Sequence, residues 1–219
     1  MIIEPKLITS NNKGKAGSNK PKFIVIHDTG NANKGAGAEN HYKWLQNNND
    51  LKRSAHLFVD SKQALQVIDY FTIAYHTGVL YTEHPEVPTC TNFNSIGIEF
   101  CVNEDGDLEK TLENTIEATK RIMKLLNIPS ERVITHQMSS GKKCPGTFIK
   151  KPELWEYFKE KIKEELPKDE VLEAGLKYLQ ENKVMQSPDY WNKKIAEVPH
   201  LRELILNMVE VLKKAQEEE

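Results

Sequence analysis

Short runs of β-branched and aromatic residues alternate with longer segments of helical periodicity over the first three quarters of the chain. Five of the short runs have the length and composition of buried strands; they span residues 23–26, 57–59, 65–68, 96–102 and 132–135. Three longer segments carry apolar residues three or four positions apart; they span residues 38–48, 109–127 and 152–166. The connections are long enough for parallel pairing, so the pattern predicts an α/β fold in which helices cover a sheet.

After Pro167 the pattern changes to helical periodicity alone. Apolar residues recur at helical spacing from Val171 to Leu179 and again from Leu201 to Leu212. A segment of about 50 residues buries too little surface to form a robust domain alone. We therefore expect a main domain, residues 1–166, and a small all-α C-terminal module, residues 168–219.

The composition is that of a soluble globular chain of 219 residues, with 38% hydrophobic and 28% charged side chains. Thirty basic and thirty-two acidic side chains give a net charge of −2, so neither nucleic acid nor a membrane is expected as a partner. No apolar run approaches the roughly 18 residues that span a bilayer. The first ten residues lack the apolar core of a standard signal peptide, so synthesis in the cytoplasm without such a signal is expected.

The three cysteines, Cys90, Cys101 and Cys144, are odd in number and widely spaced. They do not form a disulfide framework or a CxxC pair, and reduced thiols are expected for a chain made in the cytosol. Cys90 and Cys101 lie in or near apolar runs and are expected to be buried small side chains. Cys144 has a different setting, beside two lysines in the segment HQMSSGKKCPG.

Metal-binding side chains follow the ends of two predicted strands. His27 ends the first strand, His136 ends a late strand, and Cys144 follows eight residues later. Strand ends in α/β sheets open onto a crevice where ligands bind. The positive charges of Lys142 and Lys143 would favour the thiolate form of Cys144. Two imidazoles and one thiolate would suit Zn²⁺ and would leave its fourth coordination position open. The spacing alone leaves a purely structural role open, for example a hydrogen-bonded His27 at the strand end.

Four sequence blocks, in order, resemble those of the type-2 N-acetylmuramoyl-L-alanine amidases. The blocks are IVIHDTGN, SAHLFVD, NSIGIEFCVNEDG and THQMSSGKKCPG, and the similarity runs from about Lys22 to Leu166. This family consists of zinc enzymes with the peptidoglycan-recognition-protein fold and is common among phage endolysins and bacterial autolysins. The resemblance implies a mixed central β-sheet flanked by helices, and it does not extend to the C-terminal module.

The resemblance also implies roles for single residues. His27, His136 and Cys144 match the zinc ligands, and Glu99 matches the catalytic glutamate, which exchanges the proton of the attacking water. Lys142 matches the lysine that stabilises the oxyanion. From pattern alone, Glu99 would be interpreted as a surface carboxylate on an alternating strand and Lys142 as a solvated loop charge.

One position departs from the family pattern. Some relatives have a tyrosine where Ala55 precedes His56, so Glu99 is expected to carry more of the acid–base work. His56 and His76 are candidates to line the substrate groove, the alternative being packed histidines with satisfied hydrogen bonds. The other histidines of interest, His41, His84 and His200, are expected to be surface or packing residues. Tyr42 and Trp44 are expected to lie on the core-facing side of a helix.

The function that the resemblance implies is zinc-dependent hydrolysis of the amide between N-acetylmuramic acid and L-alanine in peptidoglycan. Such an enzyme would lyse the bacterial cell wall after release from the cytoplasm, by a holin-type or other non-standard route. The alternatives are a cytoplasmic muropeptide-recycling amidase and a non-catalytic peptidoglycan-binding domain, although such domains usually lack the cysteine ligand. Residues 168–219 would target the wall through Tyr190 and Trp191, form a homodimer through their helices, or pack on the main domain.

Overall fold

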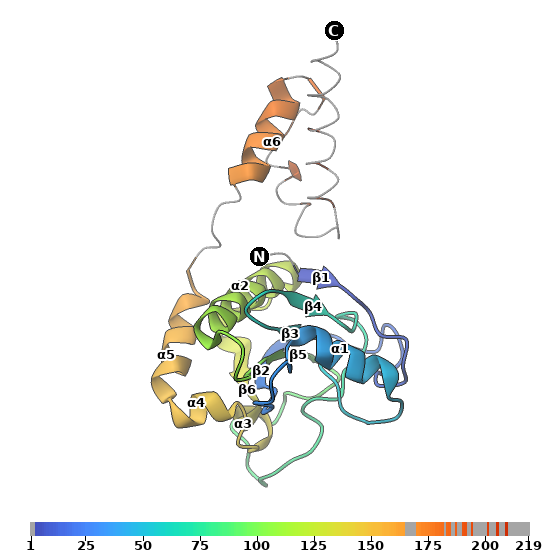
Figure 1. Ribbon diagram of the computed structural model, residues 1–219, viewed down its shortest axis with the longest axis vertical. Coiled ribbons are helices and arrows are strands. Elements are labelled where there is room, and N and C mark those ends of the chain that lie inside the picture. The colour runs from blue at the N-terminus through green and yellow to red at the C-terminus, as the bar shows by residue number, and fades with distance from the viewer. Residues whose placement is uncertain are drawn as a thin grey trace. The chain divides into compact units, whose positions relative to one another are not determined.

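The structure, a computed structural model, describes residues 3–164 and part of the C-terminal segment. The described C-terminal residues are 170–181, 183–184, 187, 190–191, 194, 201, 205 and 209. By its contacts the chain divides into two compact units, residues 1–165 and 166–219 (Figure 1).

The first unit is built on a six-stranded mixed sheet with the order β1-β4-β3-β5-β2-β6. Its strands are β1 (Ile3–Pro5), β2 (Phe23–Asp28), β3 (Leu57–Val59), β4 (Ala64–Gln66), β5 (Ser95–Phe100) and β6 (Val133–Thr135). β3 and β4 pair antiparallel, and the other neighbours pair parallel. This architecture confirms the predicted fold class. Only β1 was not predicted among the strands, because its sequence, Ile-Glu-Pro, is not an apolar run.

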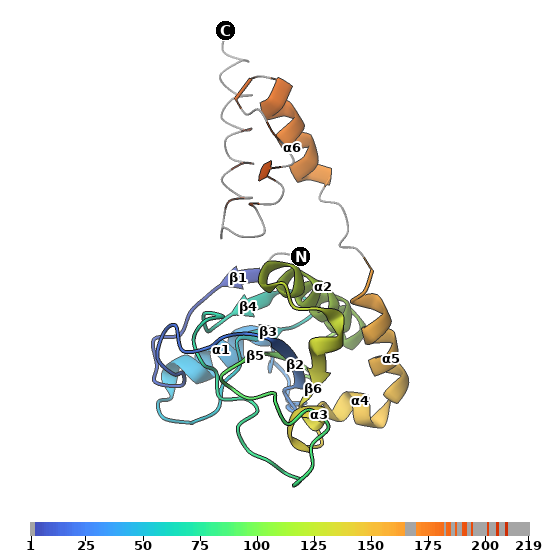
Figure 2. The same cartoon turned by 180° about the vertical axis from the view of Figure 1, so that it is seen from behind.

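The helices of the first unit cover both faces of this sheet (Figure 2). They are α1 (Ala38–Asn47), α2 (Leu108–Leu126), α3 (His136–Ser140), α4 (Gly146–Lys150) and α5 (Pro152–Lys161), with a 3₁₀ turn at Ser130–Arg132. α2 and α5 pack on the face to which the β2 and β5 isoleucines point, and α1 packs on the opposite face. The two short helices α3 and α4 were not predicted, and α5 ends earlier than the predicted 152–166.

Local sequence signals account for the ends of the longest helix, α2. The side chain of Asp107 caps its first turn by accepting a hydrogen bond from the backbone N–H of Lys110. Asn127 ends it in the left-handed conformation, where its backbone N–H donates to the carbonyl of Met123. Its apolar face contributes Leu112, Ile116 and Ile122 to the core. Among the described residues, no helix is both long and apolar enough to cross a membrane.

The second unit contains α6 (Glu170–Glu181) and a small apolar cluster of its own. Leu176, Leu179, Ile205 and Val209 are buried in this cluster, and Trp191 is one of three partly buried residues packed against it. Much of the predicted helix 201–212, and His200, lie outside the described residues.

Candidate metal centre and active-site pocket

The register of β2 against β5 places a histidine beside a carboxylate. His27 in β2 pairs with Glu99 in β5, and side chains of paired residues point to the same face of a sheet. Ile26 and Ile98, one residue earlier, point to the opposite face and into the core. Strand alternation therefore presents His27 and Glu99 together, on the face that α2 and α5 do not cover.

The loop between β6 and α4 brings the other two predicted ligands to the same place. His136 is the first residue of α3, and Thr135 caps that helix by accepting from the backbone N–H of Met138. Gly141 then ends α3 with φ +82°, a conformation that L side chains rarely adopt. The chain turns back so that the carbonyl of Cys144 accepts a hydrogen bond from the backbone N–H of Gln137.

The three donor atoms form a compact set that suits a metal ion. One ligand atom each from His27, His136 and Cys144 lies within 4.8 Å of the other two. Nδ1 of His27 is 3.7 Å from Sγ of Cys144, and Nδ1 of His136 is buried without a hydrogen-bond partner. Burial lowers the pKa of both histidines, to about 4 for His136, so both rings stay neutral and keep a lone pair. An unsatisfied imidazole beside a second imidazole and a thiol fits Zn²⁺.

The thiol of Cys144 is not activated by the neighbouring lysines as the sequence suggested. Burial raises its pKa to about 12, and the carboxylate of Glu99 acts in the same direction. Lys142 opposes this rise only weakly. A bound dication, rather than lysine, is therefore the group that would hold this thiol as a thiolate.

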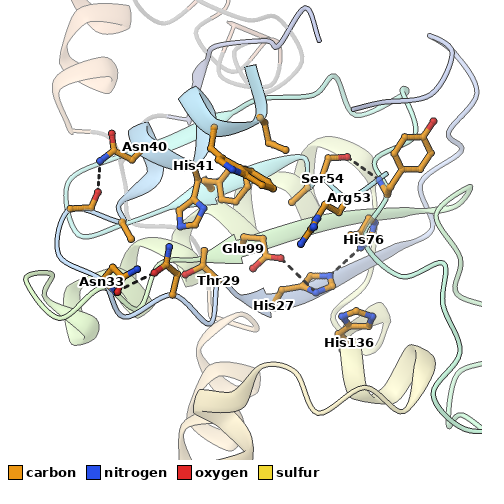
Figure 3. A pocket seen from close by; sticks show the side chains of 18 of the residues that line it. His27, Thr29, Asn33, Asn40, His41, Arg53, Ser54, His76, Glu99 and His136 are labelled. Atoms are coloured by element: carbon orange, nitrogen blue, oxygen red, sulfur yellow. Dashed lines mark hydrogen bonds and ion pairs between the residues drawn. The ribbon is translucent and has the colours of Figure 1, made fainter. Parts of the chain in front are cut away.

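Glu99 lies beside the donor set, with its side chain 22% exposed. Its Oε1 atom is 4.0 Å from Nδ1 of His27, and its Oε2 atom is buried without a partner (Figure 3). Loss of hydration, followed by the negative charge of Asp28, raises the pKa of Glu99 to about 8, and Lys142 lowers it. Glu99 is therefore not an ordinary surface carboxylate, because it lines the pocket and its Oε2 atom is shielded from solvent.

Lys142 differs from its neighbour Lys143. Lys142 lines the pocket, and its charge contributes to the pKa shifts of His27, Glu99, His136 and Cys144. Lys143 contributes to none of these shifts and does not line the pocket. The structure thus brings Lys142 to the predicted ligands, and leaves Lys143 as an exposed loop charge.

The two candidate groove histidines occupy different positions. His76 lines the pocket next to His27, and its Nδ1 is 3.1 Å from Nε2 of His27. His56 is fully buried; its Nδ1 accepts from the backbone N–H of Gly97, and its Nε2 lies 3.0 Å from the carbonyl of Thr72. The expectation that His56 lines the groove is therefore not met, because both ring nitrogens are taken up by backbone groups.

The pocket, of about 610 Å³, extends from the donor set toward α1. Most of its lining residues were not predicted as site residues, among them Thr29, His41 and Trp44. Trp44 is 43% exposed, so the prediction that it is helix core is wrong. Oγ1 of Thr29 and Nε2 of His41 are buried without partners. Helical spacing assigned Trp44 to the core, and only the fold shows that this position of α1 faces a cavity.

Comparison with known proteins identifies relatives of this chain. A family model described as N-acetylmuramoyl-L-alanine amidase matches residues 17–147, a range that contains the whole donor set and Glu99. The N-acetylmuramoyl-L-alanine amidase CwlH of Bacillus subtilis (strain 168) is 35% identical over 150 residues, which are 68% of this chain and 57% of that protein. XlyA of the same organism is 33% identical over 139 residues, 64% of this chain and 43% of that protein. The chain therefore spans about half the length of these relatives.

Solved structures show the same fold. The catalytic domain of XlyA matches with a TM-score of 0.63 at 32% identity, covering 74% of this chain and 99% of that domain. The structure of PlyL matches with a TM-score of 0.62 at 32% identity, covering 74% of this chain and 97% of that one.

Proposed function

The chain belongs to the N-acetylmuramoyl-L-alanine amidase family, and we propose that it hydrolyses the amide between N-acetylmuramic acid and L-alanine in peptidoglycan, using zinc. The observation that carries this proposal is the convergence of His27, His136 and Cys144 beside the partly buried side chain of Glu99. A purely structural cluster would satisfy its own hydrogen bonds. Here both the His136 ring and Glu99 keep an unpartnered buried atom.

Each residue of the site has a task that its position explains. His27, His136 and Cys144 would hold the zinc ion, which would supply Lewis acidity toward the scissile carbonyl and the attacking water. Glu99, with its pKa near 8, takes the proton from that water at its free Oε2 atom and passes it to the leaving amine. Lys142, which lines the pocket, would stabilise the negative charge of the oxyanion.

The rest of the pocket supports a polar, extended substrate. Thr29 and His41 present unpartnered buried atoms, and a buried polar atom without a partner is destabilising unless a ligand satisfies it. Peptidoglycan offers amide, hydroxyl and carboxylate groups on both its glycan and its peptide. We assign these two residues to substrate binding, on the α1 side of Glu99.

Cell-wall lysis is the biological outcome that we propose, with the protein reaching the wall after a holin-type or other non-standard release. The proposal draws on a relative whose solved structure is described as a mutant endolysin from Bacillus subtilis and is 34% identical to this chain. In the same proposal, residues 166–219 bind the wall, and the exposed ring of Tyr190 is part of that surface.

Metal analysis and wall lysis together test this function. Purified protein is expected to contain about one zinc per chain and to release L-alanine N-termini from purified walls. Cys144→Ser is expected to lose the zinc at micromolar protein and with it the activity. The matched control is Cys101→Ser, because Cys101 is also buried and lies outside the donor set. The proposal would be overturned if chelator-treated protein lysed walls fully without added metal. It would also be overturned if Cys144→Ser kept one zinc per chain.

A further inference from the structure

A chain of hydrogen bonds leads from His27 away from the donor set. Nδ1 of His27 faces Sγ of Cys144, so its other nitrogen, Nε2, is directed to Nδ1 of His76 at 3.1 Å. Nε2 of His76 is in turn 3.1 Å from Oγ of Ser95. Oγ of Ser95 donates to the backbone carbonyl of Thr91 at 2.6 Å.

The carbonyl at the end of this chain fixes the proton at every link. A carbonyl oxygen only accepts, so the Ser95 hydroxyl proton is committed to Thr91 and Oγ of Ser95 accepts from His76. His76 therefore carries its proton on Nε2, and its Nδ1 has a lone pair. That lone pair accepts from Nε2–H of His27. The proton of His27 is then held on the side remote from Cys144, and Nδ1 keeps the lone pair that a metal requires.

The backbone around His76 holds its ring in place. A Cβ atom built on Gly97 would lie 2.7 Å from Cγ of His76, so only glycine at this position of β5 lets the ring lie against the strand. Oδ1 of Asn92 accepts from the backbone N–H groups of His76 and Thr77 at 3.0 and 2.8 Å. The ring is 8% exposed. These contacts fix the position from which His76 accepts.

We infer that His76 is the positioning residue of the metal centre, which sets the tautomer and the orientation of His27 through the relay His27–His76–Ser95–Thr91. The inference rests on the proposed function only in that the donor set binds zinc. It assigns to His76 a part in metal affinity rather than contact with the substrate. Partners of this kind, one bond away from a ligand, typically change metal affinity by about 10- to 100-fold when removed.

Two variants of nearly equal size separate hydrogen bonding from packing. His76→Leu removes the acceptor and is expected to weaken zinc binding by about 10- to 100-fold in a chelator competition on the full chain. His76→Asn can place its Oδ1 where Nδ1 of the ring was, so it is expected to bind zinc about 10-fold more tightly than His76→Leu. The Co²⁺-substituted Asn variant should also keep the visible absorption spectrum of the wild-type protein. Equal weakening in the two variants, or none in either, would overturn the inference.

Nitrogen NMR of the wild-type zinc protein tests the same point without a substitution. The expected result is a proton on Nε2 of His76 and on Nε2 of His27; a proton on Nδ1 of His76 would contradict the relay. Ser95→Ala, a milder change, is expected to weaken zinc binding in the same direction as His76→Leu but less. If the wild-type chain binds no zinc, the proposed function fails; if it binds zinc and only these comparisons fail, the inference alone is wrong.

Discussion

Buried ionisable side chains gather in the first unit of the chain, whereas the buried side chains described in the second unit are all apolar. The first unit buries four histidines, His27, His56, His76 and His136, together with Asp60. The second unit buries Leu176, Leu179, Ile205 and Val209 in the part that the structure describes. Burying apolar groups stabilises a fold, while burying ionisable groups opposes it unless partners compensate. The first unit therefore contains the buried groups that lower the stability of the fold unless hydrogen bonds or a ligand compensate.

Within the first unit, the hydrogen bonding of buried polar groups distinguishes those that support the fold from those that line the pocket. His56 is fully buried and both of its ring nitrogens meet backbone groups. Five buried side-chain atoms among the described residues lack a partner, and all but that of Asn19 belong to residues that line the one pocket described here. Those four residues are Thr29, His41, Glu99 and His136. Unpartnered buried atoms therefore mark the residues that line the pocket more sharply than burial does.

Among the variants that test this comparison, Glu99→Gln is expected to have the largest effect on turnover. The amide keeps the size of the side chain and cannot accept the proton, so turnover should fall by about 10²- to 10⁴-fold. Zinc content and binding to purified walls should stay near the wild-type values, because Glu99 is not one of the three donors. Glu109→Gln, on the exposed first turn of α2, is the matched control for loss of a carboxylate. A parallel loss of zinc would make Glu99 a structural partner of the metal centre.

Lys142→Ala is expected to lower turnover by about 10²- to 10³-fold, the loss typical for removal of an oxyanion donor. The neighbouring variant Lys143→Ala removes the same charge from the same loop and should leave turnover within about threefold of wild type, since an exposed charge away from the pocket interacts weakly. The measurement is steady-state hydrolysis of a soluble muropeptide. Equal effects of the two variants would mean that the net charge of the loop, and not the position of Lys142, is what matters.

The pH dependence of stability is the next test of the buried histidines. Burial lowers the pKa of His56 to about 4, below the ordinary value of 6.5. Between pH 6.5 and pH 4, His56 is therefore protonated in the unfolded chain but not in the folded chain. The stability present above pH 6.5 is lost as the pH falls toward 4. His56 alone should account for about 3 kcal/mol between pH 7 and pH 4 in the metal-free protein. Urea titrations of wild type and His56→Gln measure it; an equal loss in both would show that other groups dominate.

The sequence was sufficient to predict five of the six strands, the longer helices and the three residues of the donor set, but not the short elements β1, α3 and α4 or the pocket. Apolar runs ending in His27 and His136 predict strand ends, and the family resemblance selects Cys144 and Glu99 from many alternatives. His41 and Trp44 were assigned to surface or core because helical spacing does not show what faces a helix. The relay through His76 and Ser95 joins residues from separate segments, and no local pattern encodes it. Similarly, the pKa rise of Cys144 depends on burial, which outweighs the adjacent lysines.

The smallest effect on catalysis is expected from removing the second unit by ending the chain after Pro167. Each unit has its own apolar cluster, so the truncated protein should keep its melting temperature and its hydrolysis of a soluble muropeptide. If the second unit binds the wall, retention on purified cell walls should drop, and lysis of intact walls with it.

Tyr190→Ala in the full chain tests wall binding by a single substitution, because this exposed ring is the aromatic surface that we assign to wall binding. A truncated protein that melts earlier and loses soluble activity would instead make residues 168–219 part of the catalytic fold. Unchanged retention would leave dimerisation as the role to test, by the sedimentation of the full and truncated chains.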